Sequence, residues 1–325
     1  MHSARIYDGP MSKVEQTETP SRARRLAKAV IILLGILIVY FVSSFLITYS
    51  NKVSVMNDLG KVDALVSLRR VEPDWYLYWT EGGRQYSFNC KQDALSPFST
   101  IHAIQLEGNS VNDELLRKLI VFKNLEYLIL DNTNTTQDGI TYLEYFPKLQ
   151  TLWLNGTKIM DVSVLRKLSH LYELELNNTK VGDDCLKSLT CHNSLKFLSL
   201  NGTKISDDAL KSIGEFKELS GLSLRQTNVS DGCLQFIKEL PKLVSLDLAG
   251  TGISDEGLRN LKSIPKLITL DLSGTQVTVQ GLRVFAEHTN LDRIVIEGIK
   301  TTDKEIEQLK EEVPSLKRVW ITRNQ

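Results

Sequence analysis

The chain has 325 residues, of which 42% are hydrophobic and 24% are charged. Its 39 basic residues (Lys and Arg) balance its 39 acidic residues (Asp and Glu), so the formal net charge is zero. A nucleic-acid-binding domain typically shows a basic excess, which this composition lacks. Nucleic acid is therefore not an expected partner.

An uncharged apolar stretch, residues 29–49, follows a polar segment, residues 1–28, that becomes basic toward its end. About 20 apolar residues are enough to cross a bilayer as a helix. The alternative is a cleaved signal peptide, but its apolar region would be about 7–15 residues long and would precede a site with small residues. The sequence SFLITYSNKV offers no such site. We therefore predict a transmembrane helix over 29–49 that stays in the mature protein and makes the lipid bilayer a partner.

The charges that flank this stretch predict its orientation. Four basic side chains lie in residues 14–28, and two lie in residues 50–64. Because basic residues are retained on the cytoplasmic side, the tail 1–28 is expected in the cytoplasm. The remainder of the chain is then extracytoplasmic, and the protein is a single-pass protein of the cell membrane.

Residues 50–100 differ from the rest of the chain and are predicted to form a helix followed by a β-hairpin. Apolar residues three and four apart favour an amphipathic helix, although Gly60 interrupts it. These residues are Val55, Met56, Leu59, Val62, Leu65, Val66 and Leu68. The sequences WYLYWT and QYSFNC flank a turn at residues 81–84, as in a hairpin. Its aromatic residues form either a binding platform or a cap over the repeats that follow, and we favour the cap because the ends of a stacked array need closing.

Residues 101–325 consist of about ten repeats of one pattern. In the unit 195–218 an L-x-x-L-x-L stretch precedes a threonine and then apolar positions with helical spacing. The first positions of the units are Ile101, Leu125, Leu149, Leu171, Leu195, Leu219, Leu243, Leu267, Leu291 and Leu316. The period is 24 residues, except for a 22-residue unit at Leu149 and a 25-residue unit at Leu291. We expect a shorter outer helix in the 22-residue unit.

A single unit is too small to fold alone. Leu198 and Leu200 lie two residues apart, so on a strand they point to the same face. Leu210 and Ile213 are spaced as on a helix that turns its apolar side inward. These few apolar side chains do not offset the conformational entropy lost by ordering a whole unit. Units must therefore stack and share their buried faces.

The pattern L-x-x-L-x-L-x-x-T-x-I-x-D-x-x-L resembles the leucine-rich-repeat superfamily, and most closely its bacterial members with 24-residue repeats. The resemblance covers residues 101–325. It implies an α/β solenoid, which is a curved array with a parallel sheet on the concave face and short helices on the convex face. Members of this class are commonly membrane-anchored or exported and carry a short N-terminal cap. Single units depart from the consensus at Asn109, Thr136, Val279 and Ile299.

Two polar columns recur in the repeats and are interpreted as scaffolding. The first comprises Thr133, Thr157, Thr179, Thr203, Thr227, Thr251 and Thr275. Its place resembles the asparagine ladder of the superfamily, so its hydroxyls are expected to bond the backbone of the turn. The second comprises Asp113, Asp161, Asp183, Asp207, Asp231, Asp255 and Asp303. Carboxylates directly before a helix are expected to cap its free N–H groups.

The sequence offers no set of residues with a recognisable chemistry. No nucleophile elbow, zinc-binding helix motif, P-loop or dinucleotide fingerprint occurs, and the five histidines lack ligand spacing. Cys185 and Cys233 occupy a small, buried position of the repeat, about 10 Å apart at one strand spacing per unit, which is too far for a disulfide. We therefore expect no cofactor, no metal and no enzymatic activity.

The inner face of the sheet offers the one candidate site. Most residues that flank the buried leucines are polar, but apolar ones cluster in neighbouring units with carboxylates between them. The candidate partner-binding residues are Tyr127, Ile129, Trp153, Glu173, Glu175 and Phe197. An exposed apolar cluster with aromatic anchors is typical of an interaction surface. The alternative is that these side chains only pack on one another or on the cap. A thinner second candidate joins Val295 and Trp320.

These features favour a membrane-anchored, extracytoplasmic binding module that docks a protein or peptide ligand on its concave face. The alternative is a structural protein of the cell envelope without a discrete ligand. An enzyme has the least support, because no nucleophile, base and oxyanion donor can be named.

Overall fold

The computed structural model describes residues 100–321 without a break. It also describes the backbone of residues 64–69 and isolated helical positions at 37, 43, 44, 46, 47, 50–52, 54, 55 and 58. The chain divides into two compact units, Met1–Ser50 and Asn51–Gln325. Within the described residues no helix combines the length and the apolar composition needed to cross a bilayer. Most of the stretch 29–49 and all of the tail 1–28 lie outside the described residues, so the anchor stays a prediction.

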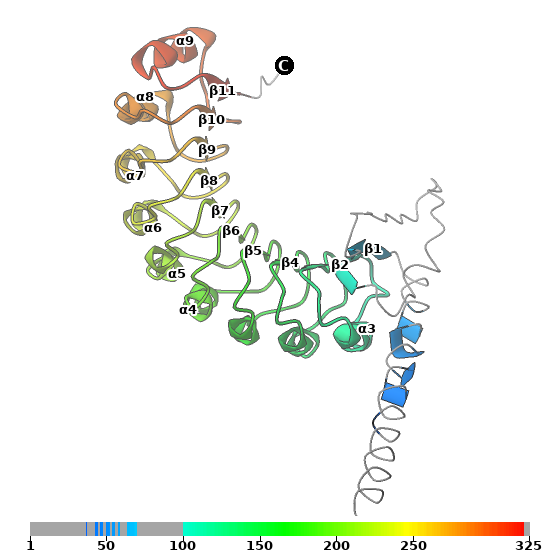
Figure 1. Cartoon of the computed structure of the whole chain (residues 1–325). Coiled ribbons are helices and arrows are strands. Elements are labelled where there is room, and N and C mark those ends of the chain that lie inside the picture. The colour runs from blue at the N-terminus through cyan, green and yellow to red at the C-terminus, as the bar shows by residue number, and fades with distance from the viewer. Residues whose placement is uncertain are drawn as a thin grey trace, which may run out of the picture. The chain divides into compact units, whose positions relative to one another are not determined.

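An eleven-stranded sheet runs through the second unit, and its strands follow one another in chain order. The strands are β1 (Ala64–Arg69), β2 (Thr100–Leu106), β3 (Tyr127–Ile129), β4 (Thr151–Trp153), β5 (Glu173–Glu175), β6 (Phe197–Ser199), β7 (Gly221–Ser223), β8 (Ser245–Asp247), β9 (Thr269–Asp271), β10 (Arg293–Val295) and β11 (Arg318–Trp320). Strands β2 to β11 are parallel, and β1 pairs antiparallel with β2. The array of repeats curves with the strands on its inner side, as Figure 1 shows.

Short helices occupy the outer side of this curve (Figure 1). The α-helices are α3 (Asp113–Lys118), α4 (Asp184–Leu189), α5 (Asp207–Leu210), α6 (Asp231–Ile237), α7 (Asp255–Leu261), α8 (Val279–Leu282) and α9 (Asp303–Glu312). The 3-10 helices are η1 (Leu119–Val121), η2 (Gly139–Tyr145), η3 (Ser163–Lys167), η4 (Ile213–Glu215) and η5 (Arg283–Phe285). The 22-residue unit carries only η3, in keeping with its missing residues. The predicted leucine-rich-repeat solenoid is confirmed.

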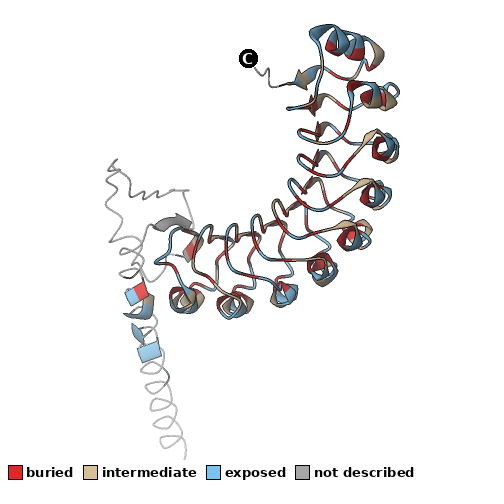
Figure 2. Ribbon diagram, turned by 180° about the vertical axis from the view of Figure 1, so that it is seen from behind, coloured by how far each residue is buried: buried red, intermediate tan, exposed pale blue. Residues whose placement is uncertain are grey.

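The core lies between the sheet and the helices. In β6 and the turn after it, Leu198 and Leu200 are 2% and 0% exposed, and the residue between them, Ser199, points the other way. Leu210 and Ile213 meet them from the outer side, and both are fully buried. Figure 2 shows buried positions along the strands and on the inward sides of the helices. Every unit therefore buries its apolar residues against its neighbours, as the stacking argument requires.

Residues 55–68 differ from the predicted continuous helix. The chain is helical at residues 51, 52, 54, 55 and 58, but residues 64–69 form strand β1. The apolar spacing there fits both periods, and the open edge of β2 decides between them, because pairing satisfies its backbone groups. Val55 is 5% exposed, and Asp58 pairs with Lys118 of α3 at 2.9 Å, so this segment contacts the first repeat. The predicted hairpin at 75–90 lies outside the described residues.

The threonine column bonds the turn backbone, as predicted. Each hydroxyl donates to the carbonyl oxygen three residues earlier, at 2.5–2.9 Å, in Thr133, Thr157, Thr179, Thr203, Thr227, Thr251 and Thr275. These bonds stay within one unit. The bonds that link units come from a different column, two residues before each threonine. There Asp131, Asn155, Asn177 and Asn201 each accept a hydrogen bond from the backbone N–H at the same position of the next unit, at 2.8–2.9 Å.

The aspartate column plays a different part from the predicted one. Asp231 accepts hydrogen bonds from the backbone N–H and the hydroxyl of Ser254, at 2.8 and 2.5 Å, one unit further on. The same pair of hydrogen bonds joins Asp113 to Thr136, Asp183 to Ser206, Asp207 to Ser230 and Asp255 to Thr278. Several of these partners cap their helices: the Ser254 hydroxyl, for example, accepts from the backbone N–H of Glu256. These five aspartates therefore join neighbouring units, whereas Asp161 bonds the start of its own helix, through Ser163.

Small residues near the helix starts leave room for these aspartates. A Cβ atom added to Gly139 would overlap Oδ1 of Asp113 and lie 2.6 Å from its Cγ. Cys185 and Cys233 stand at such small positions and are buried free thiols, whereas Cys191 is exposed. Burial raises the pKa of the Cys185 thiol to about 12, and the charge of Asp161 adds to the effect. These two cysteines are packing residues, as predicted.

The overlap at Gly139 gives a test of the link between units. We expect Gly139→Ala to reduce the free energy of unfolding by about 1–3 kcal/mol, because the methyl group displaces a hydrogen-bonded carboxylate. In an Asp113→Ala background the destabilisation caused by Gly139→Ala should be smaller by at least about 1 kcal/mol. Urea unfolding in a double-mutant cycle measures this difference. Gly182→Ala is the control, because a Cβ atom there meets nothing within 4 Å. Equal effects of Gly139→Ala in both backgrounds would contradict the proposed clash.

Candidate binding surface on the inner face of the sheet

The six candidate residues lie together on strands β3 to β6 and are called the inner patch: Tyr127, Ile129, Trp153, Glu173, Glu175 and Phe197. The parallel register places Ile129 beside Trp153, Trp153 beside Glu175, and Glu173 beside Phe197. The rings of Tyr127 and Phe197 are well exposed, at 39% and 46%, whereas the other four side chains are half-buried. The structure therefore brings the predicted residues onto one continuous surface.

Trp153 is fixed by a polar contact that the sequence does not reveal. Its indole Nε1–H donates to Oε1 of Glu173, at 3.1 Å, across to the next strand. The other oxygen of Glu173 lies 3.4 Å from the hydroxyl of Thr151. The indole thus leans over β5 and is not free in the concavity. A half-buried ring in a fixed orientation loses little conformational entropy when a partner binds.

Phe197 lies on the other side of β5 and covers the strand that follows. Its ring meets Tyr172 edge to face, with centroids 6.3 Å apart. A Cβ atom on Gly221, its neighbour in β7, would lie 2.8 Å from Cδ1 of Phe197. The absence of a side chain at residue 221 therefore lets the ring lie over β7. Apolar surface extends in this way from β3 to β7, interrupted by the two carboxylates of β5.

Asn155 connects the inner patch to the ladder that joins the units. Its Nδ2 group donates to Oε2 of Glu175 at 2.7 Å, and its backbone N–H donates to Asp131 at 2.9 Å. Partial burial raises the pKa of the Glu175 carboxyl, and the charges of Asp131 and Glu173 raise it further. Partial burial also raises the pKa of Asp131, with a contribution from Glu107. The N-terminal half of the inner face thus holds carboxylates whose ionised form is disfavoured.

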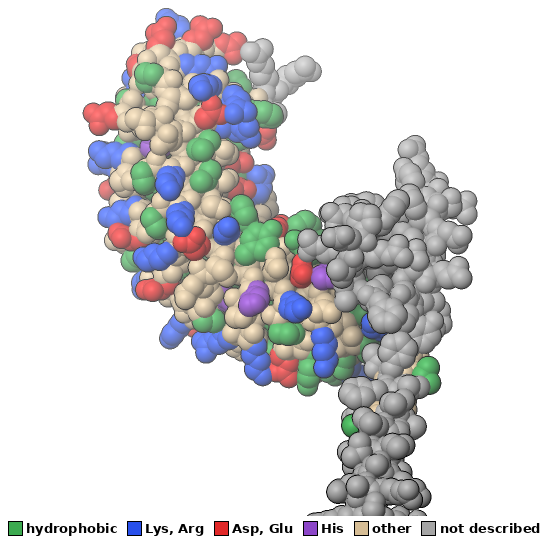
Figure 3. Space-filling model, in the orientation of Figure 1, with side chains coloured by type: hydrophobic (Ala, Val, Ile, Leu, Met, Phe, Trp, Pro, Cys, Tyr) green, Lys and Arg blue, Asp and Glu red, His purple; other side chains and the backbone are tan. Residues whose placement is uncertain are grey.

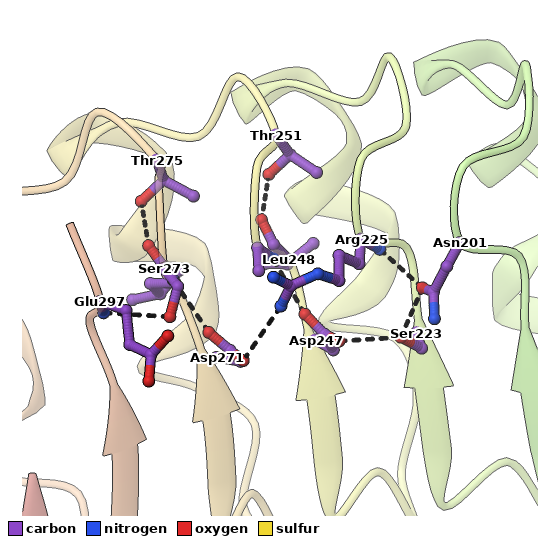
Figure 4. Close-up of polar contacts among 12 residues, drawn as sticks. Asn201, Ser223, Arg225, Asp247, Leu248, Thr251, Asp271, Ser273, Thr275 and Glu297 are labelled. Carbon is purple, nitrogen blue, oxygen red and sulfur yellow. Dashed lines mark hydrogen bonds and ion pairs between the residues drawn. The ribbon is translucent and has the colours of Figure 1, made fainter. Parts of the chain in front are cut away.

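In the C-terminal half of the inner face acidic and basic groups are combined. Figure 4 shows Arg225, whose guanidinium Nη1 lies 3.8 Å from Oδ2 of Asp271, two units away. Ser223 donates to Asp247 at 3.1 Å, and Asp247 accepts from the backbone of Ala249 at 2.9 Å. The second candidate site also contains basic groups: the guanidinium of Arg293 lies 5.9 Å from the ring centroid of Trp320, and Arg318 pairs with Asp292. Alternation along the strands predicts that Arg225 and Asp271 face inward, but it does not show that they pair.

Within the described part of the chain, no three His, Cys, Asp or Glu side chains are placed to hold a metal ion. The buried histidines belong to the packing of the repeats. His288 contacts the carbonyl oxygen of Ile264 through Nε2 at 2.8 Å and lies edge to face with Phe285. Burial lowers the pKa of His192, which occupies the same position four units earlier.

Comparisons with known proteins agree with the architecture. Residues 191–214 and 239–262 match a family model described as a leucine-rich repeat, so the chain contains leucine-rich repeats. A comparison with curated protein sequences gave no match.

Among solved structures, an internalin (inlF) from Listeria monocytogenes aligns with a TM-score of 0.52 and 23% identity. The alignment covers 68% of this chain and 59% of the internalin, so the chain spans less than two thirds of that protein. Internalin C2 (inlC2) from the same organism aligns with a TM-score of 0.50 and 22% identity, over 71% of this chain and 84% of that one. At this identity the likeness concerns the fold alone.

The pKa of Glu175 gives a prediction with a defined sign. When the pKa of a carboxyl is higher in the folded than in the unfolded protein, the folded protein loses stability as the pH rises through these two pKa values. Glu175→Gln should therefore be more stable than wild type at pH 7 and unfold at a higher denaturant concentration. The gain in the free energy of unfolding should be less than about 1 kcal/mol, because the group is partly solvated. This difference should shrink as the pH falls toward the ordinary pKa of 4.5. Denaturation series at several pH values measure it.

Glu218→Gln is the matched control, because Glu218 pairs with Lys242 at 2.6 Å and its pKa is lowered by that partner. Its effect at pH 7 should have the opposite sign. A Glu175→Gln variant that is less stable than wild type at pH 7 would contradict the interpretation of Glu175.

Proposed function

We propose that this protein binds a protein or peptide ligand through the inner patch, with Trp153 at the centre of the contact. One observation carries the proposal: aromatic rings lie on the inner face of β3, β4 and β6, whereas β7 to β9 present small or polar side chains there. Tyr127 and Phe197 lie on either side of Trp153 along the sheet. The positions that correspond to Phe197 in the next three strands are Gly221, Ser245 and Thr269. Aromatic side chains at the middle of a surface are the usual anchors of protein–protein contacts.

The arrangement supports binding better than catalysis. The polar groups around Trp153 are carboxylates and amides that bond one another, such as Glu175 with Asn155. The hydroxyl that lies near a carboxylate of this surface, that of Thr151 beside Glu173, belongs to a buried residue and is not presented to a substrate. A preformed, concave sheet face suits an extended or folded ligand that contacts several strands at once.

Trp153 and Leu154 provide a matched test, since they are consecutive residues on opposite faces of the sheet. Leu154 is fully buried, so Leu154→Ala should cost about 2–5 kcal/mol of stability. Trp153→Ala should cost about 1–2 kcal/mol, through partial burial and one hydrogen bond, and the protein should stay folded. If the inner patch binds a ligand, Trp153→Ala should weaken binding by about 2 kcal/mol or more per folded molecule.

The measurement is binding of the purified full-length chain, solubilised in a non-ionic detergent, to ligands selected on the wild-type protein. Circular dichroism and urea unfolding report the folded fraction of each variant. Binding that is unchanged per folded molecule of Trp153→Ala would show that the ring is only a packing residue. The structural-protein alternative would then gain support.

We further propose that residues 29–49 anchor the protein in the cell membrane, with residues 1–28 in the cytoplasm and the repeats outside it. The support is the length of the uncharged stretch and the basic residues on its N-terminal side. This topology would present the inner patch to ligands of the cell envelope or of the surroundings.

Proteolysis tests the topology. Protease added to intact cells, or to spheroplasts where an outer membrane is present, should digest the repeats and leave a short membrane-embedded fragment with the tail 1–28. Antibodies against the two ends detect the products, and a cytoplasmic protein serves as the control for intact membranes. Repeats that stay protected until the membrane is dissolved would refute the orientation.

A further inference from the structure

Strand β5 forms an acidic strip between two aromatic side chains. Glu173 and Glu175 both face inward, with Trp153 on the strand before and Phe197 on the strand after. Adjacent strands are about 4.8 Å apart, so the two rings arise roughly 10 Å from each other with the carboxylates between them. The hydrogen bond between Trp153 and Glu173 holds the indole over this gap. The geometry is that of two inward-facing carboxylates with one aromatic side chain on each neighbouring strand.

The negative charge on this strip has no basic counterpart in the described part of the chain. No Lys or Arg nitrogen there lies within 4.0 Å of Glu107, Asp131, Glu173 or Glu175. On the C-terminal half of the same face Asp271 has Arg225 as its partner, at 3.8 Å. On the face in view in Figure 3 acidic and basic side chains are intermixed. Glu218, in the turn between η4 and β7, pairs with Lys242.

The imbalance is maintained against a cost in stability. Partial burial and neighbouring carboxylates raise the pKa of Glu175 and of Asp131, which means that ionisation of both groups destabilises the folded protein. A neutral residue that preserved the hydrogen bond from Asn155 would avoid this cost. Burial raises the pKa of Asp247 on the C-terminal half as well. The feature that distinguishes β5 is therefore its geometry, two inward-facing carboxylates on one strand between Trp153 and Phe197.

Resting on the proposed function, we infer that the ligand of the inner patch is a protein segment that places an arginine side chain over β5, between Trp153 and Phe197. A guanidinium group is planar, stacks on aromatic rings and donates hydrogen bonds to carboxylates in a fixed fork. Each carboxylate of β5 keeps acceptor capacity beyond its present bonds, because an ionised carboxylate can accept about four hydrogen bonds. An ammonium group satisfies the charge but cannot stack or bond both carboxylates in one plane.

The test selects ligands without knowing the natural one. A random dodecapeptide library displayed on phage is panned on the full-length chain in detergent at about 0.15 M salt. It is counter-selected on the Trp153→Ala variant, so that only peptides that need the inner patch remain. We expect these peptides to contain arginine next to an apolar residue.

Affinities of the selected peptides are then measured on purified variants. Glu173→Gln together with Glu175→Gln should weaken binding about tenfold or more, and Glu218→Gln, which removes one negative charge outside the inner patch, should not. Replacing the arginine of the peptide by lysine should weaken binding about fivefold, and replacing it by glutamine should weaken it further. Unfolding curves confirm that each variant is folded.

The outcomes separate this inference from the function on which it rests. Peptides that depend on Trp153 but lack basic residues, or that bind the double glutamine variant unchanged, would overturn the basic ligand and leave the binding function in place. Equal binding of arginine and lysine peptides would overturn the choice of a guanidinium. If no peptide depends on Trp153, both the inference and the proposed binding surface are wrong.

Discussion

The structure depends on hydrogen bonds and buried leucines that only a neighbouring unit can complete. Each repeat places its strand leucines against the next unit, and two polar columns tie the units together on either side of that core. On the inner side, Asn155 accepts from the backbone of Asn177, and on the outer side, Asp231 accepts from Ser254. An unpaired buried acceptor is expensive, so the loss of one unit would expose both apolar surface and unsatisfied backbone groups of the next. Stability therefore belongs to the array and not to the repeat.

The sequence predicted the architecture because a period of 24 residues with leucines in register has few physical solutions. It did not predict the direction of the polar bonds. Asp231 stands where an N-terminal helix cap is expected, but its carboxylate accepts from Ser254 of the next unit. A pattern within one unit does not show a contact with the next unit. Residues 64–69 differ from the predicted helix for a similar reason. Their spacing allows a helix, and the free edge of β2 makes them a strand.

The candidate surface was predictable only in part. Alternation along the strands places Trp153 and Glu173 on the inner face, because residues between buried leucines must point away from the core. Spacing alone does not show that the indole donates to Glu173 or that Phe197 lies across Gly221, since these contacts depend on rotamers and strand twist. The contrast between Glu173 and Glu175, which have no Lys or Arg nitrogen of the described residues within 4.0 Å, and Asp271, which has Arg225, also required the structure. It arises from side chains two units apart, such as Arg225 and Asp271.

The scaffold and the candidate surface share one residue, and this has a consequence for binding. Asn155 uses its side-chain oxygen to hold the next unit and its side-chain nitrogen to hold Glu175. A ligand that neutralises Glu175 would remove the repulsion from Asp131 and Glu173 that now acts against the folded state. Binding should then stabilise the stacking of the third and fourth units as well as the contact itself, because any ligand that prefers the folded protein shifts its unfolding. In a solenoid, where stability passes from each unit to its neighbours, that gain would be shared along the array.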